Sequence, residues 1–335
     1  MPHEKEISRY INYKEECELS IAERIEYLTG LKEHLKSRKL TNTTCGATLW
    51  GPKLYGITQK IAKKVTSIFT DKDCEVVIEG QDNIPNETVL FAFNHQGILD
   101  GFAWIPYSKR HTIILHGGDV NKLLIAAQIN TGLVKVIKGD KKNNQGAKLD
   151  AISLLLNNHS IAWFPESTWN LSPNKILLPL NYGFIDVARI AQVPIVPVAL
   201  ENTYSLKNDK CIISKVHIRF GEVISVGQLD NLTDVLEIYK ERISTMLYEI
   251  VEKKGIYERQ AIDVDKEYAK FLEMSFKNLK LGKLNWVKEK QYIHSANDEF
   301  YSFYNINEYE YDENYCEKGL TESVKYYRKM RRKNK

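Results

Sequence analysis

Short stretches rich in β-branched and aromatic residues recur through the middle of this chain, and helical patterns lie between most of them. Strands are predicted at residues 75–79, 89–93, 112–115, 161–164, 195–200 and 216–220. Helices are predicted at 120–128, 147–156 and 181–191, so strands and helices alternate. This alternation is typical of an α/β layered domain with a largely parallel central sheet flanked by helices. We expect that domain to span residues 71–255.

The predicted strand at 89–93 is followed by a histidine, His95, and then by an aspartate, Asp100. Open α/β sheets place their sites just beyond the carboxyl ends of the strands, which is where His95 lies. Across a strand–loop–helix corner, the Asp100 carboxylate can reach one imidazole nitrogen, fix the tautomer and stabilise the imidazolium. The pattern therefore predicts a general base, His95, supported by Asp100. Backbone N–H groups near Gly97, between the two, are candidates for stabilising a tetrahedral oxyanion.

Three further blocks follow the histidine–aspartate pair, at residues 132–138, 163–168 and 193–198. In this order and at these separations, the four blocks resemble those of the lysophospholipid acyltransferase family, which includes the 1-acylglycerol-3-phosphate acyltransferases. The resemblance covers residues 74–225. It implies transfer of a fatty acyl group from a thioester, acyl-CoA or acyl carrier protein, to the hydroxyl of a lysophospholipid or related lipid. A general base is enough for such a reaction, because the thioester is already activated.

The resemblance also implies which residues contact the substrates. The glutamate of the family's third block is associated with acceptor binding, and that role falls here on Glu166. The residues expected to bind substrate are Asn94, Gly97, Lys138, Phe164, Pro165, Glu166, Ser167, Thr168 and Lys175. The family usually has arginines where this chain has Lys138 and Trp169; lysine neutralises a phosphate without arginine's bidentate fork, and tryptophan does neither. A lysophosphatidate acceptor and a less anionic lipid or polar hydroxyl therefore both stay open.

Extensions flank the predicted domain on both sides. Residues 1–70 read as an N-terminal helical segment, and its last part, 50–69, combines apolar residues with four lysines. Such a basic amphipathic helix can lie in a membrane interface or can cover one face of the sheet, and both interpretations stay open. Residues 256–335 form a C-terminal extension with an acidic, tyrosine-rich stretch and a basic tail.

Composition narrows the class of protein. A net charge of +4, with scattered basic residues, does not predict nucleic-acid binding. The five cysteines include no Cys-x-x-Cys, which favours a reducing compartment without a disulfide framework, and no histidine spacing predicts a metal site. The sequence shows no signal peptide and no apolar stretch of spanning length. We expect a cytoplasmic protein, peripheral on the inner face of the cell membrane, with no bound cofactor and an acyl thioester as co-substrate.

Two other classes of function stay open. A serine hydrolase or thioesterase would need a nucleophile, for which Ser167 is the candidate, although the chain has no Gly-x-Ser-x-Gly elbow. A non-catalytic lipid- or partner-binding protein on the same fold would keep its ligand affinity without the His95 imidazole. Substitution of His95 therefore separates these classes.

Overall fold

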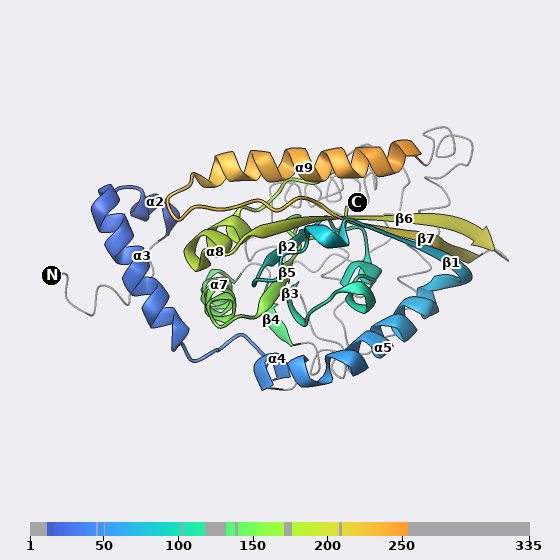
Figure 1. Cartoon of the computed structure of the whole chain (residues 1–335), viewed down its shortest axis with the longest axis horizontal. Helices are drawn as coiled ribbons and strands as arrows, with labels where there is room; N and C mark the ends of the chain where they lie inside the picture. Colours follow the sequence, from blue (N-terminus) through green and yellow to red (C-terminus); the bar gives the residue numbers. More distant parts are fainter. Residues whose placement is uncertain are drawn as a thin grey trace, which may run out of the picture.

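The central part of the chain forms one sheet with helices on both faces (Figure 1). A computed structural model describes residues 12–44, 46–49, 51–101, 103–117, 132–137, 140–170, 176–207 and 210–253. The predicted helix at 120–128, the candidate ligands Lys138 and Lys175, and the extension at 256–335 lie outside these residues.

The described residues form a seven-stranded sheet in the order β1-β7-β6-β2-β5-β3-β4. Its strands are β1 (Thr70–Glu79), β2 (Leu90–Phe93), β3 (Thr112–Gly117), β4 (Leu133–Val136), β5 (Ser160–Trp163), β6 (Ile195–Lys207) and β7 (Lys210–Phe220). All neighbours pair in parallel except β6 and β7, which form a long antiparallel hairpin. The predicted α/β fold with a largely parallel sheet is confirmed.

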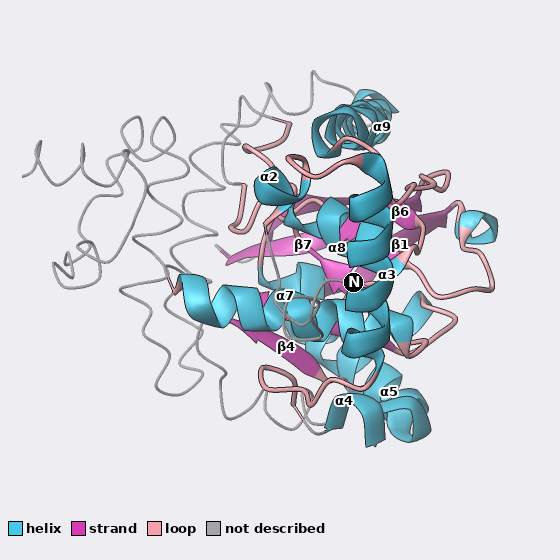
Figure 2. Cartoon of the chain, turned by 90° about the vertical axis from the view of Figure 1, so that its left-hand side faces the viewer, coloured by secondary structure: helices cyan, strands magenta, loops and turns pink. Residues whose placement is uncertain are grey.

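Helices surround this sheet as the alternation predicts. The helices are α2 (Tyr13–Glu16), α3 (Ile21–Lys36), α4 (Gly46–Leu49), α5 (Gly51–Phe69), α7 (Lys141–Leu156), α8 (Gly183–Ala191) and α9 (Leu232–Lys253), with 3-10 turns η1 (Gln81–Asn83), η2 (Ile98–Gly101) and η3 (Ile105–Tyr107). In Figure 1, α9 runs along the top of the molecule and α5 along the bottom. Figure 2 shows the same layers from the side, with the strands between α9 and α5.

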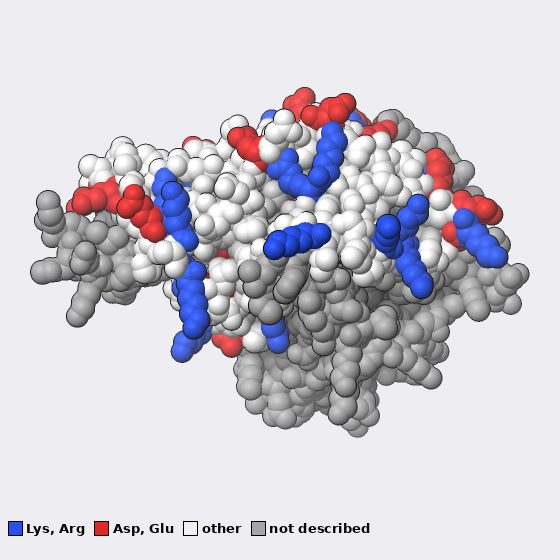
Figure 3. Space-filling model, turned by 60° about the horizontal axis from the view of Figure 1, so that its bottom comes forward, with Lys and Arg blue, Asp and Glu red and all other residues white. Residues whose placement is uncertain are grey.

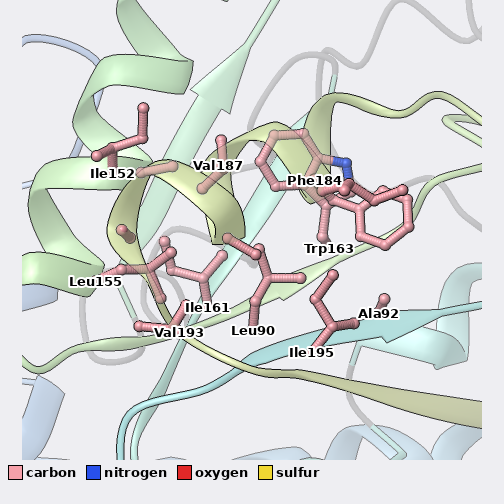
Figure 4. Packing of buried hydrophobic residues seen from close by; sticks show 14 of the residues in the cluster. Leu90, Ala92, Ile152, Leu155, Ile161, Trp163, Phe184, Val187, Val193 and Ile195 are labelled. Atoms are coloured by element: carbon pink, nitrogen blue, oxygen red, sulfur yellow. The ribbon is translucent and has the colours of Figure 1, made fainter. Parts of the chain in front are cut away.

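Two hydrophobic clusters hold the layers together, one on each face of the sheet. Successive residues of a strand point to opposite faces, so β2 contributes Leu90 and Ala92 to one cluster and Phe91 and Phe93 to the other. Figure 4 shows the first cluster, in which these β2 residues pack with side chains of α7 and α8 such as Phe184. The second cluster is aromatic and lies on the side of α5 and η3. Because β2 is central and buried on both faces, its carboxyl end has a well-defined position.

The linker between α3 and α4 covers one edge of the sheet. The Asp150 carboxylate on α7 accepts the backbone N–H groups of Thr41 (2.9 Å) and Asn42 (2.7 Å) and pairs with Arg38 (3.0 Å). The Lys135 N–H of β4 donates to the Asn42 carbonyl (2.8 Å). These bonds occupy part of the outer edge of β4, which would otherwise present unpaired backbone groups.

A buried ion network ties the N-terminal helices to α8. Both carboxylate oxygens of Glu16 accept from the Arg189 guanidinium, at 2.8 and 2.7 Å, and Arg189 also pairs with Asp186 at 2.6 Å. Glu16 and Arg189 are fully buried, so each charge depends on its partner.

We expect Glu16→Gln to lower the free energy of unfolding by about 3 kcal/mol, because it leaves part of a buried guanidinium charge uncompensated. Urea denaturation measures this value. Glu237→Gln on α9, which removes an exposed ion pair with Lys240, serves as the control and is expected to change stability by under about 0.5 kcal/mol. Equal effects of the two substitutions would contradict the assignment.

Candidate active site

His95 lies just beyond the carboxyl end of β2, and Asp100 lies in the short η2 turn that follows. The His95 Nδ1 atom is 2.8 Å from Asp100 Oδ2. The same oxygen accepts the backbone N–H of Gly97 (2.7 Å) and that of Gln96. With Asp100 only 1% exposed, these N–H groups replace the water that its charge would otherwise need. The N–H groups near Gly97, expected as oxyanion donors, thus hold the aspartate in this structure.

This geometry suits a general base. A carboxylate that accepts from Nδ1–H selects the tautomer in which Nε2 carries the lone pair. Nε2 is then the nitrogen that takes a proton, and the nearby carboxylate stabilises the imidazolium that results. The expected pairing of His95 with Asp100 therefore has the geometry that its predicted role requires.

The segment that follows β5 surrounds His95. The His95 N–H donates to Glu166 Oε1 (2.8 Å), and the His95 carbonyl accepts from the Asn170 N–H (2.6 Å). The Phe164 ring lies against the imidazole, with centroids 4.4 Å apart, and the Trp169 ring meets it edge-on at 6.2 Å. Residues from the first and third blocks, about 70 positions apart in sequence, therefore form one site because β2 and β5 are neighbours in the sheet.

Glu166 is buried, with 5% of its surface exposed. Its Oε1 accepts from His95, and its Oε2 accepts the Leu178 N–H at 2.8 Å. Burial raises the pKa of this carboxyl to about 8; the two backbone N–H groups oppose the rise and the charge of Asp100 adds to it.

Asn94 and Gln96, on either side of His95, attach the loop to β6. Asn94 is buried, and its side-chain amide pairs with the backbone of Leu200, donating at 2.9 Å and accepting at 2.7 Å. Gln96 accepts the Asn202 N–H (3.0 Å) and donates to the buried Glu201 carboxylate. Gln96, Glu201 and Asn202 were not among the site residues predicted from the sequence. Their signal was positional: one flanks His95, and the other two continue the predicted strand at 195–200.

The remaining candidates of the third block lie in the turn after β5. The Pro165 carbonyl accepts the Asn181 N–H (2.9 Å), which joins this turn to the start of α8. Ser167 is exposed and has a left-handed backbone, with φ of 59°, and it makes no hydrogen bond to His95 within the described part of the chain. Thr168 is buried, and its hydroxyl has no partner among the described residues.

Close packing does not require a glycine at position 97, because a Cβ atom on Gly97 would have no neighbouring atom within 4 Å. Within the described ranges, no group of three His, Cys, Asp or Glu side chains could hold a metal ion.

Residues 75–201 match the family model described as Acyltransferase. This segment is therefore similar to the Acyltransferase family. It begins in β1 and ends in β6, and it contains His95, Asp100 and Glu166. The family match therefore covers the strands that build the site.

Individual proteins match more distantly. The chain is 22% identical over 209 residues to 1-acyl-sn-glycerol-3-phosphate acyltransferase of Saccharomyces cerevisiae, a match that spans 59% of this chain and 66% of the yeast protein. Among solved structures, it is similar to the 1-acyl-sn-glycerophosphate (LPA) acyltransferase PlsC of Thermotoga maritima, with 18% identity and a TM-score of 0.48, over 59% of this chain and 79% of that one.

The raised pKa of Glu166 predicts a pH effect on stability. The folded state holds the Glu166 proton more tightly than the unfolded chain does, where the pKa is 4.5. Its contribution is therefore fully present below pH 4.5 and is lost as pH rises toward about 8. We expect the unfolding free energy of the wild type, relative to Glu166→Gln, to fall between pH 5 and pH 8. Urea titrations at several pH values test this, and parallel pH curves for the two proteins would contradict it.

Proposed function

We propose that this protein is a glycerolipid O-acyltransferase that moves a fatty acyl group from an acyl thioester to the hydroxyl of a lysophospholipid or related lipid. The observation that carries the proposal is the His95–Asp100 pair, 2.8 Å apart at the end of a central strand inside an Acyltransferase-family segment. The similarity to the yeast 1-acyl-sn-glycerol-3-phosphate acyltransferase supports a phosphorylated glycerolipid as the acceptor class. Acyl-CoA and acyl carrier protein both remain donors in this proposal.

The reaction follows from the geometry of the pair. The acceptor hydroxyl gives its proton to His95 Nε2 as its oxygen attacks the thioester carbonyl, and Asp100 stabilises the imidazolium. The tetrahedral intermediate then collapses, the C–S bond breaks, and the leaving thiolate takes the proton from Nε2. The products are an ester and a free thiol, and His95 returns to its neutral form.

The serine hydrolase alternative receives no support from the position of Ser167. Its side chain is exposed and makes no hydrogen bond to His95 within the described residues, so the base does not activate this hydroxyl here. Direct transfer, in which His95 activates the acceptor itself, needs no such contact.

We expect His95→Ala to lower acceptor-dependent thiol release by at least about 100-fold, because the acceptor hydroxyl loses its base. The assay offers acyl-CoA or acyl carrier protein together with lysophosphatidate or other lysolipids, and measures both free thiol and acylated lipid. His34→Ala changes an exposed histidine on α3 and serves as the control.

Three other results would contradict acyl transfer with His95 as the base. Thiol release that needs no acceptor, and that is equally lost in His95→Ala, would favour a thioesterase. Release by the mutant at the wild-type rate would remove His95 from the mechanism. A folded wild-type protein that releases no thiol from any donor would favour the binding-protein alternative.

The α5 helix supports a peripheral contact with the membrane. One side packs on the domain, where the Tyr55 hydroxyl donates to the Ile105 carbonyl (3.1 Å) of η3. The other side exposes Ile57, half of whose surface is accessible, and the lysines Lys53, Lys60, Lys63 and Lys64. The helix contains no acidic residue. Both interpretations of this helix are therefore compatible, because different sides cover the sheet and face outward.

Figure 3 turns the bottom of the molecule, where α5 lies, toward the reader, and lysine and arginine side chains are spread across its described part. Basic residues are attracted to the anionic lipids of the cytoplasmic leaflet. We therefore propose that the protein lies peripherally on the inner face of the cell membrane, with α5 in the interface. Within the described chain, no helix is both long and apolar enough to cross a bilayer.

We expect the double variant Lys63→Gln, Lys64→Gln to bind anionic vesicles at least about 10-fold more weakly, since each lysine near the surface contributes about 1 kcal/mol. Sedimentation with phosphatidylserine-containing vesicles measures this. Lys141→Gln, Lys142→Gln at the start of α7 removes the same charge from another exposed site and is expected to have a smaller effect. Equal losses in the two variants would show that only net charge matters.

A further inference from the structure

The third block holds the His95 backbone from both sides. Its N–H donates to the Glu166 carboxyl group, and its carbonyl accepts from the Asn170 N–H. Both bonds come from the turn after β5, so this turn and the loop after β2 are joined at the residue that carries the base.

The Glu166 carboxylate is committed to these backbone contacts. Oε1 binds the His95 N–H and Oε2 binds the Leu178 N–H, each at 2.8 Å, and the side chain is almost completely buried. Each oxygen therefore already accepts a backbone N–H group, whichever protonation state the carboxyl group has. An acceptor molecule that approached either oxygen from the side of these N–H groups would have to displace the His95 or the Leu178 hydrogen bond.

We propose that Glu166 is a positioning residue for the base: its carboxylate fixes the main chain at His95, and thereby the place where Nε2 meets the acceptor hydroxyl, without binding the acceptor. This inference rests on the acyl transfer proposed above. It assigns Glu166 a different role from the acceptor contact that the family resemblance implies.

The arrangement explains why this bond affects the reaction rather than only the fold. Asp100 fixes the rotation of the imidazole about its side-chain bonds, whereas Glu166 fixes the backbone from which the side chain starts. Displacement of a catalytic group by about 1 Å can reduce a rate by about 100-fold. Loss of the Glu166 bond is therefore expected to reduce the chemical step and to leave acceptor affinity unchanged.

The test compares Glu166→Gln with Asp150→Asn. Asp150 is a matched control because it is also a buried carboxylate that accepts two backbone N–H groups, those of Thr41 and Asn42, but it lies on α7 and holds the linker. We expect Glu166→Gln to lower kcat about 10- to 100-fold with the acceptor KM changed less than about twofold. Asp150→Asn is expected to keep both constants within about twofold, once rates are referred to folded protein.

A second measurement does not depend on activity. The chain has 8 histidines, so ¹⁵N-histidine labelling yields a small set of backbone amide signals, and the His95 signal is the one lost in His95→Ala. We expect this signal to move strongly in Glu166→Gln and to stay in place in Asp150→Asn. If Glu166→Gln fails to fold, Glu166→Asp keeps the carboxyl group and shortens its reach, and the same measurements apply to it.

Each outcome has a definite meaning. A rise in acceptor KM of about 10-fold or more with kcat unchanged would overturn the proposal in favour of direct acceptor binding. A His95 amide signal that does not move would overturn it as well. If the wild type transfers no acyl group, the proposed function is wrong. The amide signals still decide whether Glu166 accepts the His95 N–H and fixes its backbone.

Discussion

The hydrogen bond between His95 and Asp100 is the interaction on which the site depends, and it needs support from several directions. A buried carboxylate is stable only where hydrogen bonds replace its water, and here the backbone N–H groups of Gln96 and Gly97 do so. Those N–H groups converge only when the loop after β2 has one conformation. The loop is in turn held by the two strands that flank β2, so the imidazole depends on the order of the sheet.

The parallel pairing of β2 with β5 and β6 brings the carboxyl ends of three strands to one edge. The turn after β5 contributes Glu166 and Asn170, which bond the His95 main chain. The continuation of β6 contributes Leu200 and Asn202, which bond the side chains on either side of His95. His95 is therefore held by segments that follow both neighbouring strands, as the proposed general base requires if it is to present one nitrogen in one position.

Two features distinguish the surroundings of this site: the Trp169 side chain beside His95 and the lysine-bearing side of α5 on the outside of the domain. At the position where the family usually has an arginine, the Trp169 ring lies edge-on to His95, so this part of the surface is aromatic instead of cationic. In the proposed reaction, an acceptor bound beside His95 would meet an aromatic side chain at that position. The lysine-bearing side of α5 adds positive charge on the outside of the domain, which is the basis of the proposed contact with an anionic membrane.

The local features could be predicted from the sequence: the apolar strands, the amphipathic helices, the alternation that makes an α/β sheet, and the His95–Asp100 pair, whose members are five positions apart. These depend on neighbours along the chain. The contacts around the pair could not be predicted in this way, because the hydrogen bonds between His95 and Glu166 and between Asn94 and Leu200 join residues 71 and 106 positions apart. The strand order that creates these contacts has no local signal. For that reason the resemblance could suggest acceptor binding by Glu166, while the fold revealed a carboxylate that is occupied by two backbone N–H groups.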